Sequence, residues 1–419
     1  MPLAPLNKIL AQIDGYHDAT IELQRQLTAI PALAPENGGE GEKQKADFLR
    51  TWVQQNLKPD DLQEYHAPDS RVPCGYRPNL VARFNGNASS RTVWIMSHMD
   101  VVPPGDLSKW TGDPWVVRVE KNKKGRTRLI GRGTEDNQAG LVSSVFAVKA
   151  FRDLGLTPVS NLGLVLVSDE ETGSTYGIKY LLDHHRDLFG EDDLIIIPDA
   201  GDEKGAVIEV AEKSILWLRF HTRGIQTHAS IPERGRNAHK AASFLAVRLD
   251  SLYKKFRKRD PVFSPPISTF EPTKREANVP NVNTIPGEDV MYFDCRVLPD
   301  YKVTDILREV KKIAKEIEQQ FKVKIAISSP NSDQAAPPTA ADAPVVLALT
   351  RALRELRRVR AKPVGIGGGT VAAFFRRHRI PAAVWATMDD TAHSPDEYCL
   401  VEHMLEDAKI FAHVFLQKD

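Results

Sequence analysis

Cysteine is scarce in this chain of 419 residues, and its three cysteines, Cys74, Cys295 and Cys399, are far apart. This spacing excludes a disulfide framework and a zinc site made of thiolates, and it is typical of a protein of the reducing cytosol. Long apolar runs are missing too, since none approaches the roughly 20 residues needed to span a bilayer. The first residues lack the charged and apolar regions of a secretory signal. We therefore expect a cytoplasmic protein that does not contact membranes.

An excess of charge of one sign is also missing. The chain has 56 basic and 55 acidic residues, and its formal net charge is +1. This balance provides no general attraction to nucleic acid or to an anionic membrane. The basic run at residues 254–259 is the local exception, and we interpret it as a solvated helix end. No nucleic-acid partner is expected.

The length favours two domains, because one hydrophobic core seldom grows to this size. Between residues 80 and 200, apolar runs alternate with helical stretches such as 140–154. That alternation is typical of βαβ units, so we expect a mostly parallel α/β sheet with helices on both faces.

The pattern changes for the middle of the chain and then returns. Residues 214–329 read as β-α-β-β-α-β, a ferredoxin-like α+β unit. A helix at 341–358, a loop at 365–369 and a strand at 380–385 then resume the earlier pattern. We predict a catalytic domain formed by residues 1–213 and 330–419, with a domain of residues 214–329 inserted into it.

Residues of metal-binding type follow successive apolar runs. The runs are 93–96, 129–130, 162–167, 194–197 and 382–385. The carboxyl ends of neighbouring parallel strands meet at one edge of a sheet, which is where such folds bind ligands. The residues that follow these runs are His98, Asp100, Asp136, Glu170, Glu171, Asp199 and His393.

Each of these residues has an ordinary explanation when it is taken alone. His98 could be a hydrogen-bonded core histidine, Asp136 a turn residue, and Glu170 with Glu171 a solvated pair. Together they supply two imidazoles and at least three carboxylates, enough for two zinc ions that share a carboxylate and a water. Manganese or cobalt would suit the same oxygen-rich site. One carboxylate of the pair could bind metal while its neighbour serves as general base.

Three segments resemble the metal-site motifs of the zinc-dependent amidohydrolases and exopeptidases. They are Ser-His-Met-Asp-Val-Val-Pro at 97–103, Gly-Arg-Gly-Thr-Glu-Asp at 131–136 and Asp-Glu-Glu-Thr-Gly at 169–173. This family includes acetylornithine deacetylase, succinyl-diaminopimelate desuccinylase, aminoacylase, carnosinase-like dipeptidases and glutamate carboxypeptidase. The resemblance runs in order from about Leu23 to the C-terminus.

The resemblance implies a role for each metal-binding type of residue. Asp136 would bridge two zinc ions, His98 and Asp199 would complete one site, and Glu171 and His393 would complete the other. Cobalt or manganese could substitute for zinc.

The resemblance also implies catalytic and substrate-binding residues. Glu170 would be the general base, and Asp100 would orient His98. The inserted domain would act as a lid and dimer contact, and its His228 would stabilise the oxyanion in the partner's active site. Asn283 and Arg296 match substrate-binding positions, and Arg296 suits a bidentate grip on a carboxylate. A salt bridge within the lid is the alternative role for Arg296.

The glycine-rich segment 365–370 lacks the Gly-Lys-Ser/Thr ending of a phosphate-binding loop. The family has a glycine-rich loop here that lines the substrate pocket, which implicates Gly369 and Thr370. The chain departs from the family at Val371, where Asp is frequent, at Ser97, where Gly is common, and at 137–138, where Met-Lys is common. None of these departures removes a ligand, but they leave the substrate class open.

The expected activity is hydrolysis of the amide bond of an N-acyl amino acid or small peptide with a free carboxylate. Succinyl-diaminopimelate desuccinylase and acetylornithine deacetylase are the most similar activities, and a homodimer through the lid is expected. One alternative is a dipeptidase or carboxypeptidase of broad specificity. A non-catalytic binding protein on the same fold is the alternative from another class.

Overall fold

The computed structural model describes residues 3–418 and divides the chain into two compact units. The first unit comprises Met1–Val210, Thr339–Pro363 and Phe374–Asp419. The second comprises Ala211–Pro338 and Val364–Ala373. The segment 214–329, predicted to be an inserted domain, lies within the second unit, which also includes the whole glycine-rich segment 365–370.

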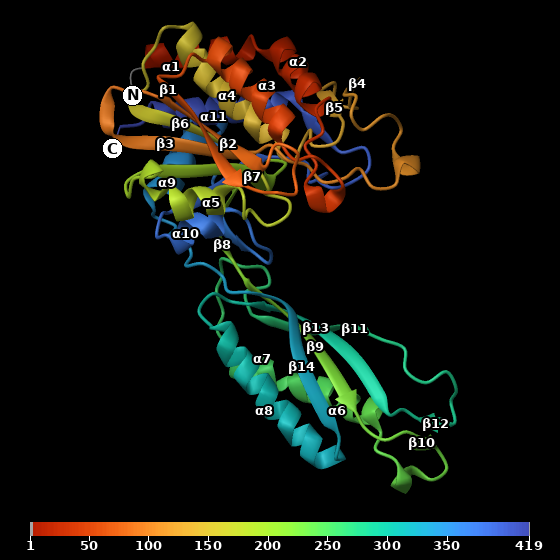
Figure 1. The fold of residues 1–419 in the computed structure, drawn as a ribbon. Coiled ribbons are helices and arrows are strands. Elements are labelled where there is room, and N and C mark those ends of the chain that lie inside the picture. Colours follow the sequence, from red (N-terminus) through yellow and green to blue (C-terminus); the bar gives the residue numbers. More distant parts are fainter. Residues whose placement is uncertain (1–2, 419) are drawn as a thin grey trace. The chain divides into compact units, whose positions relative to one another are not determined.

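The first unit is organised by a sheet of eight strands (Figure 1), although the last residues of its strands β8 and β15 belong to the second unit. The four central strands β6, β3, β7 and β16 are parallel, while β1 is antiparallel to β2, β2 to β6 and β8 to β16. In sheet order the strands are β1 (Asp61–Pro68), β2 (Tyr76–Phe84), β6 (Ser160–Val167), β3 (Ala88–His98), β7 (Leu194–Asp202), β16 (Ala382–Thr387), β8 (Val207–Glu212) and β15 (Lys362–Ile366).

The central strands are continuously apolar because both of their faces are buried. In β6 every residue from Leu162 to Val167 is buried. Gly163 pairs with Trp94 of β3, and a Cβ atom at Gly163 would lie 1.9 Å from the Trp94 ring. The glycine therefore makes room for the largest side chain of the core at this point.

Helices α4 and α11 pack against each other and against the central strands. Buried residues occur on nearly every face of α4, because the sheet, α11, α1 and α2 surround it. A small sheet, in the order β17-β5-β4, adjoins them. The helices that accompany the eight-stranded sheet, and the strands of the small sheet, have the following bounds: α1 (Leu3–Asp14), α2 (His17–Thr28), α3 (Lys43–Asn56), α4 (Gln138–Asp153), α5 (Ile178–His184), α9 (Pro344–Ala352), α10 (Ala372–Arg377), α11 (Val401–Phe415), β4 (Arg118–Lys121), β5 (Thr127–Ile130) and β17 (Tyr398–Leu400).

The second unit has a four-stranded antiparallel sheet in the order β11-β13-β9-β14. In β9, Leu216, Leu218 and Phe220 are buried in a core shared with α6 and α8, whereas Trp217 between them is 43% exposed. One face is thus covered by helices, as the alternating sequence predicts. The elements are β9 (Ser214–Arg223), β10 (Thr227–His228), α6 (Ala238–Leu249), α7 (Ser251–Lys255), β11 (Thr269–Arg275), β12 (Thr284–Ile285), β13 (Glu288–Val297), α8 (Val303–Phe321) and β14 (Lys324–Asp333).

The predicted fold class is confirmed: a mostly parallel α/β core sheet accompanies a βαββαβ unit of ferredoxin-like order. The antiparallel strands at the sheet margins were not foreseen. Among residues 3–418, no helix combines the length and apolar character that a membrane span requires.

Candidate metal centre

Three parallel strands bring their C-terminal ends to one place in the first unit. His98 is the last residue of β3, Asp199 lies near the end of β7, and Glu170 and Glu171 follow β6. Asp136 precedes α4, and His393 follows β16. These strand and helix ends supply two groups of possible metal ligands, and both groups contain Asp136.

The first group consists of His98, Asp136 and Asp199. Nε2 of His98 lies 3.0 Å from Oδ1 of Asp136 and 3.4 Å from Oδ1 of Asp199. His98 is almost fully buried, and its Nδ1 lies 3.0 Å from the carbonyl oxygen of Asp100. That contact orients the ring so that Nε2 faces the carboxylates. In a ligating histidine, the ring nitrogen that does not bind the metal usually makes such a contact.

The second group consists of Asp136, Glu171 and His393. Nε2 of His393 lies 3.1 Å from Oδ2 of Asp136 and 3.1 Å from Oε2 of Glu171. Asp136 therefore presents one carboxylate oxygen to each imidazole. Such a shared carboxylate between two mixed nitrogen and oxygen sets suits a pair of divalent cations.

The protonation of the metal-free site reflects these contacts. Burial alone would lower the pKa of His98, but its hydrogen bonds with Asp100, Asp136 and Asp199 raise it well above 6.5. Hydrogen bonds with Asp136 and Glu171 raise the pKa of His393 to about 10. For Asp136, burial raises the pKa, and the bonds to His393 and His98 more than reverse this effect. The protons on the two imidazoles thus balance carboxylate charge that cations would otherwise balance.

Glu170 has a different environment from Glu171. Burial and the nearby charge of Asp199 raise the pKa of Glu170 well above its ordinary value. Its backbone N–H donates to Oδ1 of Asp100 at 3.1 Å, and that of Glu171 donates to Oδ2 at 3.0 Å. Asp100 thus holds the backbone of both glutamates in addition to contacting His98, a role that the sequence did not indicate.

Asn137 is a further residue whose place the sequence did not indicate. Its Nδ2 donates to Oδ1 of Asp199 at 2.8 Å, and its Oδ1 accepts from the backbone N–H of His98 at 3.3 Å. The residue thus connects two members of the first group. In the sequence it appeared only as a departure from the family pattern.

A buried ion pair lies behind the glutamates. Nε of Arg77 donates to Oε2 of Glu42 at 2.6 Å, and both side chains are fully buried. Nη1 of Arg77 lies 3.7 Å from Oδ1 of Asp169, the residue before Glu170. This pair ties the start of α3 to the end of β6.

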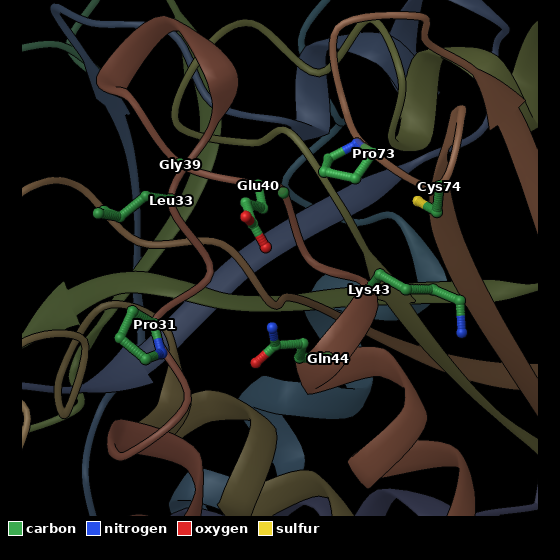
Figure 2. A pocket seen from close by; sticks show the side chains of 9 residues that line it. Pro31, Leu33, Gly39, Glu40, Lys43, Gln44, Pro73 and Cys74 are labelled. Atoms are coloured by element: carbon green, nitrogen blue, oxygen red, sulfur yellow. The ribbon is translucent and has the colours of Figure 1, made fainter.

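A cavity of about 390 Å³ opens beside the start of α3 (Figure 2). Its wall includes Leu33, and the neighbouring Ala32 accepts a hydrogen bond from the N–H of Val101 at 3.1 Å. The cavity is lined by Pro31, Leu33, Gly39, Glu40, Gly41, Lys43, Gln44, Pro73 and Cys74. None of these residues was predicted to belong to the site, so a ligand group that enters this cavity would meet side chains outside the motifs.

The remaining candidates lie in the second unit. His228 and Asn283 are exposed and close together, because β10 pairs with β12 and the N–H of Ala229 donates to the carbonyl of Asn283 at 2.9 Å. Nδ1 of His228 lies 2.7 Å from Oγ of Ser230.

Arg296 and the glycine-rich loop form a separate cluster of the second unit. Arg296 makes a bidentate pair with Asp294, with distances of 2.7 and 3.0 Å, and its Nη1 donates to the carbonyl of Gly367 at 2.8 Å. The hydroxyl of Thr370 donates to Oε1 of Glu212 at 2.5 Å. A Cβ atom at Gly369, between Gly367 and Thr370, would meet no other atom within 4 Å, so the loop is open there. The salt bridge considered as the alternative role of Arg296 is thus present in the structure.

Comparison with known proteins defines the class of this protein. Residues 94–417 match the model of peptidase family M20/M25/M40, and the chain belongs to this family. It is therefore a metal-dependent hydrolase, and the predicted family and enzyme class are confirmed.

Individual relatives agree with this assignment. An uncharacterised metallohydrolase of Methanocaldococcus jannaschii is 37% identical, with 94% of this chain and 98% of the relative covered. A succinyl-diaminopimelate desuccinylase of Sulfurovum is 28% identical over 75% of this chain and 80% of its own length. In fold, the chain is similar to the aminopeptidase PepT of Bacillus cereus, with a TM-score of 0.73, 18% identity and coverage of 95% and 98%.

Proposed function

We propose that this protein is a two-zinc amidohydrolase that cleaves an N-acyl amino acid or a short peptide with a free carboxylate. The observation that carries the proposal is Asp136, whose two oxygens face separate imidazoles at 3.0 and 3.1 Å. His98 and Asp199 would hold one ion, Glu171 and His393 the other, and Asp136 both. Bound zinc at such a site would lower the pKa of a water to about 7.

Glu170 is proposed as the group that moves the proton. It would accept the proton of the attacking water and pass it to the nitrogen of the leaving amine. A carboxyl group does both steps well only when its pKa lies near the working pH. The burial of Glu170 and the charge of Asp199 raise its pKa in that direction.

His228 is proposed to stabilise the oxyanion of the tetrahedral intermediate, supplied by the partner subunit of a homodimer through the second unit. Its exposure and the contact of Nδ1 with Ser230 support a role in which Nε2 meets the substrate. A donor aimed at this oxyanion stabilises the transition state more than the ground state.

The substrate carboxylate is proposed to bind at Arg296, with Asn283, Gly369 and Thr370 contributing further contacts. Arg296 now pairs with Asp294, so binding of a substrate carboxylate requires exchange of this intrachain partner. The relative named as a desuccinylase supports an acyl amino acid as the substrate class. The three free cysteines support a reducing, cytoplasmic location.

A hydrolysis screen tests the proposal. The protein is loaded with zinc, cobalt or manganese and given N-succinyl-diaminopimelate, N-acetylornithine, other acyl amino acids and dipeptides. Turnover of acyl amino acids that Glu170→Gln abolishes supports the proposal. Turnover of dipeptides alone supports the broad peptidase instead, and metal-loaded protein that cleaves no amide contradicts the amidohydrolase assignment.

A further inference from the structure

Two loops that carry candidate metal ligands lie side by side in the first unit. Strands β5 and β17 pair antiparallel, with Tyr398 opposite Ile130. The loop that follows β5, residues 131–137, therefore adjoins the loop that precedes β17, residues 388–397. The first loop carries Asp136, and the second carries His393.

Glu397, in the second loop, binds the backbone of the first. Its Oε1 accepts hydrogen bonds from the N–H groups of Glu135 and Asp136, both at 3.0 Å. Its Oε2 accepts from the N–H of Gly133 at 2.9 Å and from Nη1 of Arg132 at 2.5 Å. Glu397 is fully buried, so these four donors replace its hydration.

Glu135, in the first loop, binds the backbone of the second. Its Oε1 accepts from the N–H of Asp389 at 2.7 Å. Its Oε2 accepts from the N–H of Thr391 and lies 2.8 Å from the hydroxyl of the same residue. Glu135 is only 4% exposed.

We propose that Glu135 and Glu397 form a reciprocal clamp that positions Asp136 and His393 for metal binding. Each carboxylate belongs to one loop and holds the backbone of the other, so neither loop can shift alone. The clamp residues are positioning residues and not ligands, since their oxygens already accept the bonds described above. The inference rests on the proposed function only for the ligand roles of Asp136 and His393.

Backbone conformation shows why the second loop needs such a restraint. Asp390, His393 and Asp396 have φ values of 60°, 62° and 55°, in the left-handed region that L-residues other than glycine seldom occupy. Strained residues persist where their surroundings hold them. Glu135 holds the loop two residues before His393, and Glu397 holds it four residues after.

The clamp predicts an asymmetry between its two halves. Glu135 holds only the loop of His393, which belongs to one candidate ligand group. Glu397 holds the N–H of Asp136, which belongs to both groups. Loss of the Glu135 contacts should therefore lower the affinity for one metal ion, whereas loss of the Glu397 contacts should lower the affinity for both ions.

The test measures Zn²⁺ binding to the metal-free full chain by calorimetry, together with the visible absorption of bound Co²⁺, which reports ligand geometry. Glu135→Gln should bind one of two ions about 10-fold more weakly, and Glu397→Gln should bind both about 10-fold more weakly, as for other groups that orient ligands.

The control is Asp193→Asn. Asp193 is also buried and accepts from Trp94 Nε1 at 2.7 Å and from the N–H of Thr92 at 2.8 Å, but contacts neither loop. We expect the Asp193→Asn variant to have a lower Tm but unchanged affinities for both Zn²⁺ ions and an unchanged Co²⁺ spectrum.

Unchanged affinities and spectra in both clamp variants would overturn the proposal, even if Tm falls as in the control. Equal weakening of both ions in Glu135→Gln would also overturn it, because the asymmetry would be absent. If Glu397→Gln does not fold, Glu135→Gln decides the outcome by itself. The readout needs no substrate, so a protein that binds metal but cleaves no amide refutes the proposed function and leaves the clamp standing.

Discussion

Binding of zinc should release protons at neutral pH. In the metal-free site the pKa of His393 is raised to about 10 and that of His98 well above 6.5, so both imidazoles are protonated at pH 7. An imidazole binds metal only through a deprotonated nitrogen, so each must lose its proton. The binding constant for the ion at His393 should therefore rise about 10-fold for each pH unit between roughly pH 7 and 9, and the proton lost by His98 adds to the pH dependence of the other ion.

Calorimetry can count these protons. Zn²⁺ is titrated into metal-free protein at pH 7 in buffers with different enthalpies of ionisation, and the slope of observed heat against buffer enthalpy gives the number released. We expect at least two, one fewer in His393→Ala, and no change in His228→Ala, since His228 lies in neither ligand group. Release of fewer than one proton, or a zinc affinity that does not change as the pH rises, would contradict this prediction.

Four further predictions follow from the same structure. Glu170→Gln should retain zinc and lower kcat by at least about 10²-fold, and normal turnover by the zinc-loaded variant would contradict its role. His228→Ala should lower kcat at unchanged zinc content, so an unchanged kcat removes the histidine from the mechanism. Arg77→Met strands buried carboxylate charge and should lower the free energy of unfolding in urea by about 3–5 kcal/mol, and a loss below about 1 kcal/mol would contradict this. Gly163→Ala should cost about 1–3 kcal/mol because its Cβ meets the Trp94 ring. Gly368→Ala, which meets no atom within 4 Å, is its control, and equal losses in the two variants would show that the clash is not the cause.

Much of this molecule follows from local sequence. Strands buried on both faces must be apolar throughout, so β6 and β7 stand out as short apolar runs. The residue at the end of such a strand lies at the sheet edge whatever the rest of the chain does. His98, Glu171 and Asp199 could therefore be grouped before their distances were known. The alternating pattern of β9 likewise predicted a sheet with one covered face.

The residues whose hydrogen bonds position the candidate ligands could not be predicted in this way. Glu135, Glu397 and Asn137 lie in irregular loops, where no periodicity indicates the direction of a side chain. Their hydrogen bonds join residues that are distant in sequence, as from Glu397 to Gly133 and from Asn137 to Asp199. The pairing of Arg296 with Asp294 is local in sequence. Whether Arg296 binds that carboxylate or the carboxylate of a substrate depends on the rotamers of Arg296 and Asp294, which the sequence does not specify.

The residue types that end the strands follow from the sequence alone, because burial and the two-residue repeat of a strand are local constraints. The backbone N–H groups that each buried carboxylate binds are known only from the folded chain. That choice depends on the pairing of β5 with β17, which brings together two loops about 260 residues apart in the chain.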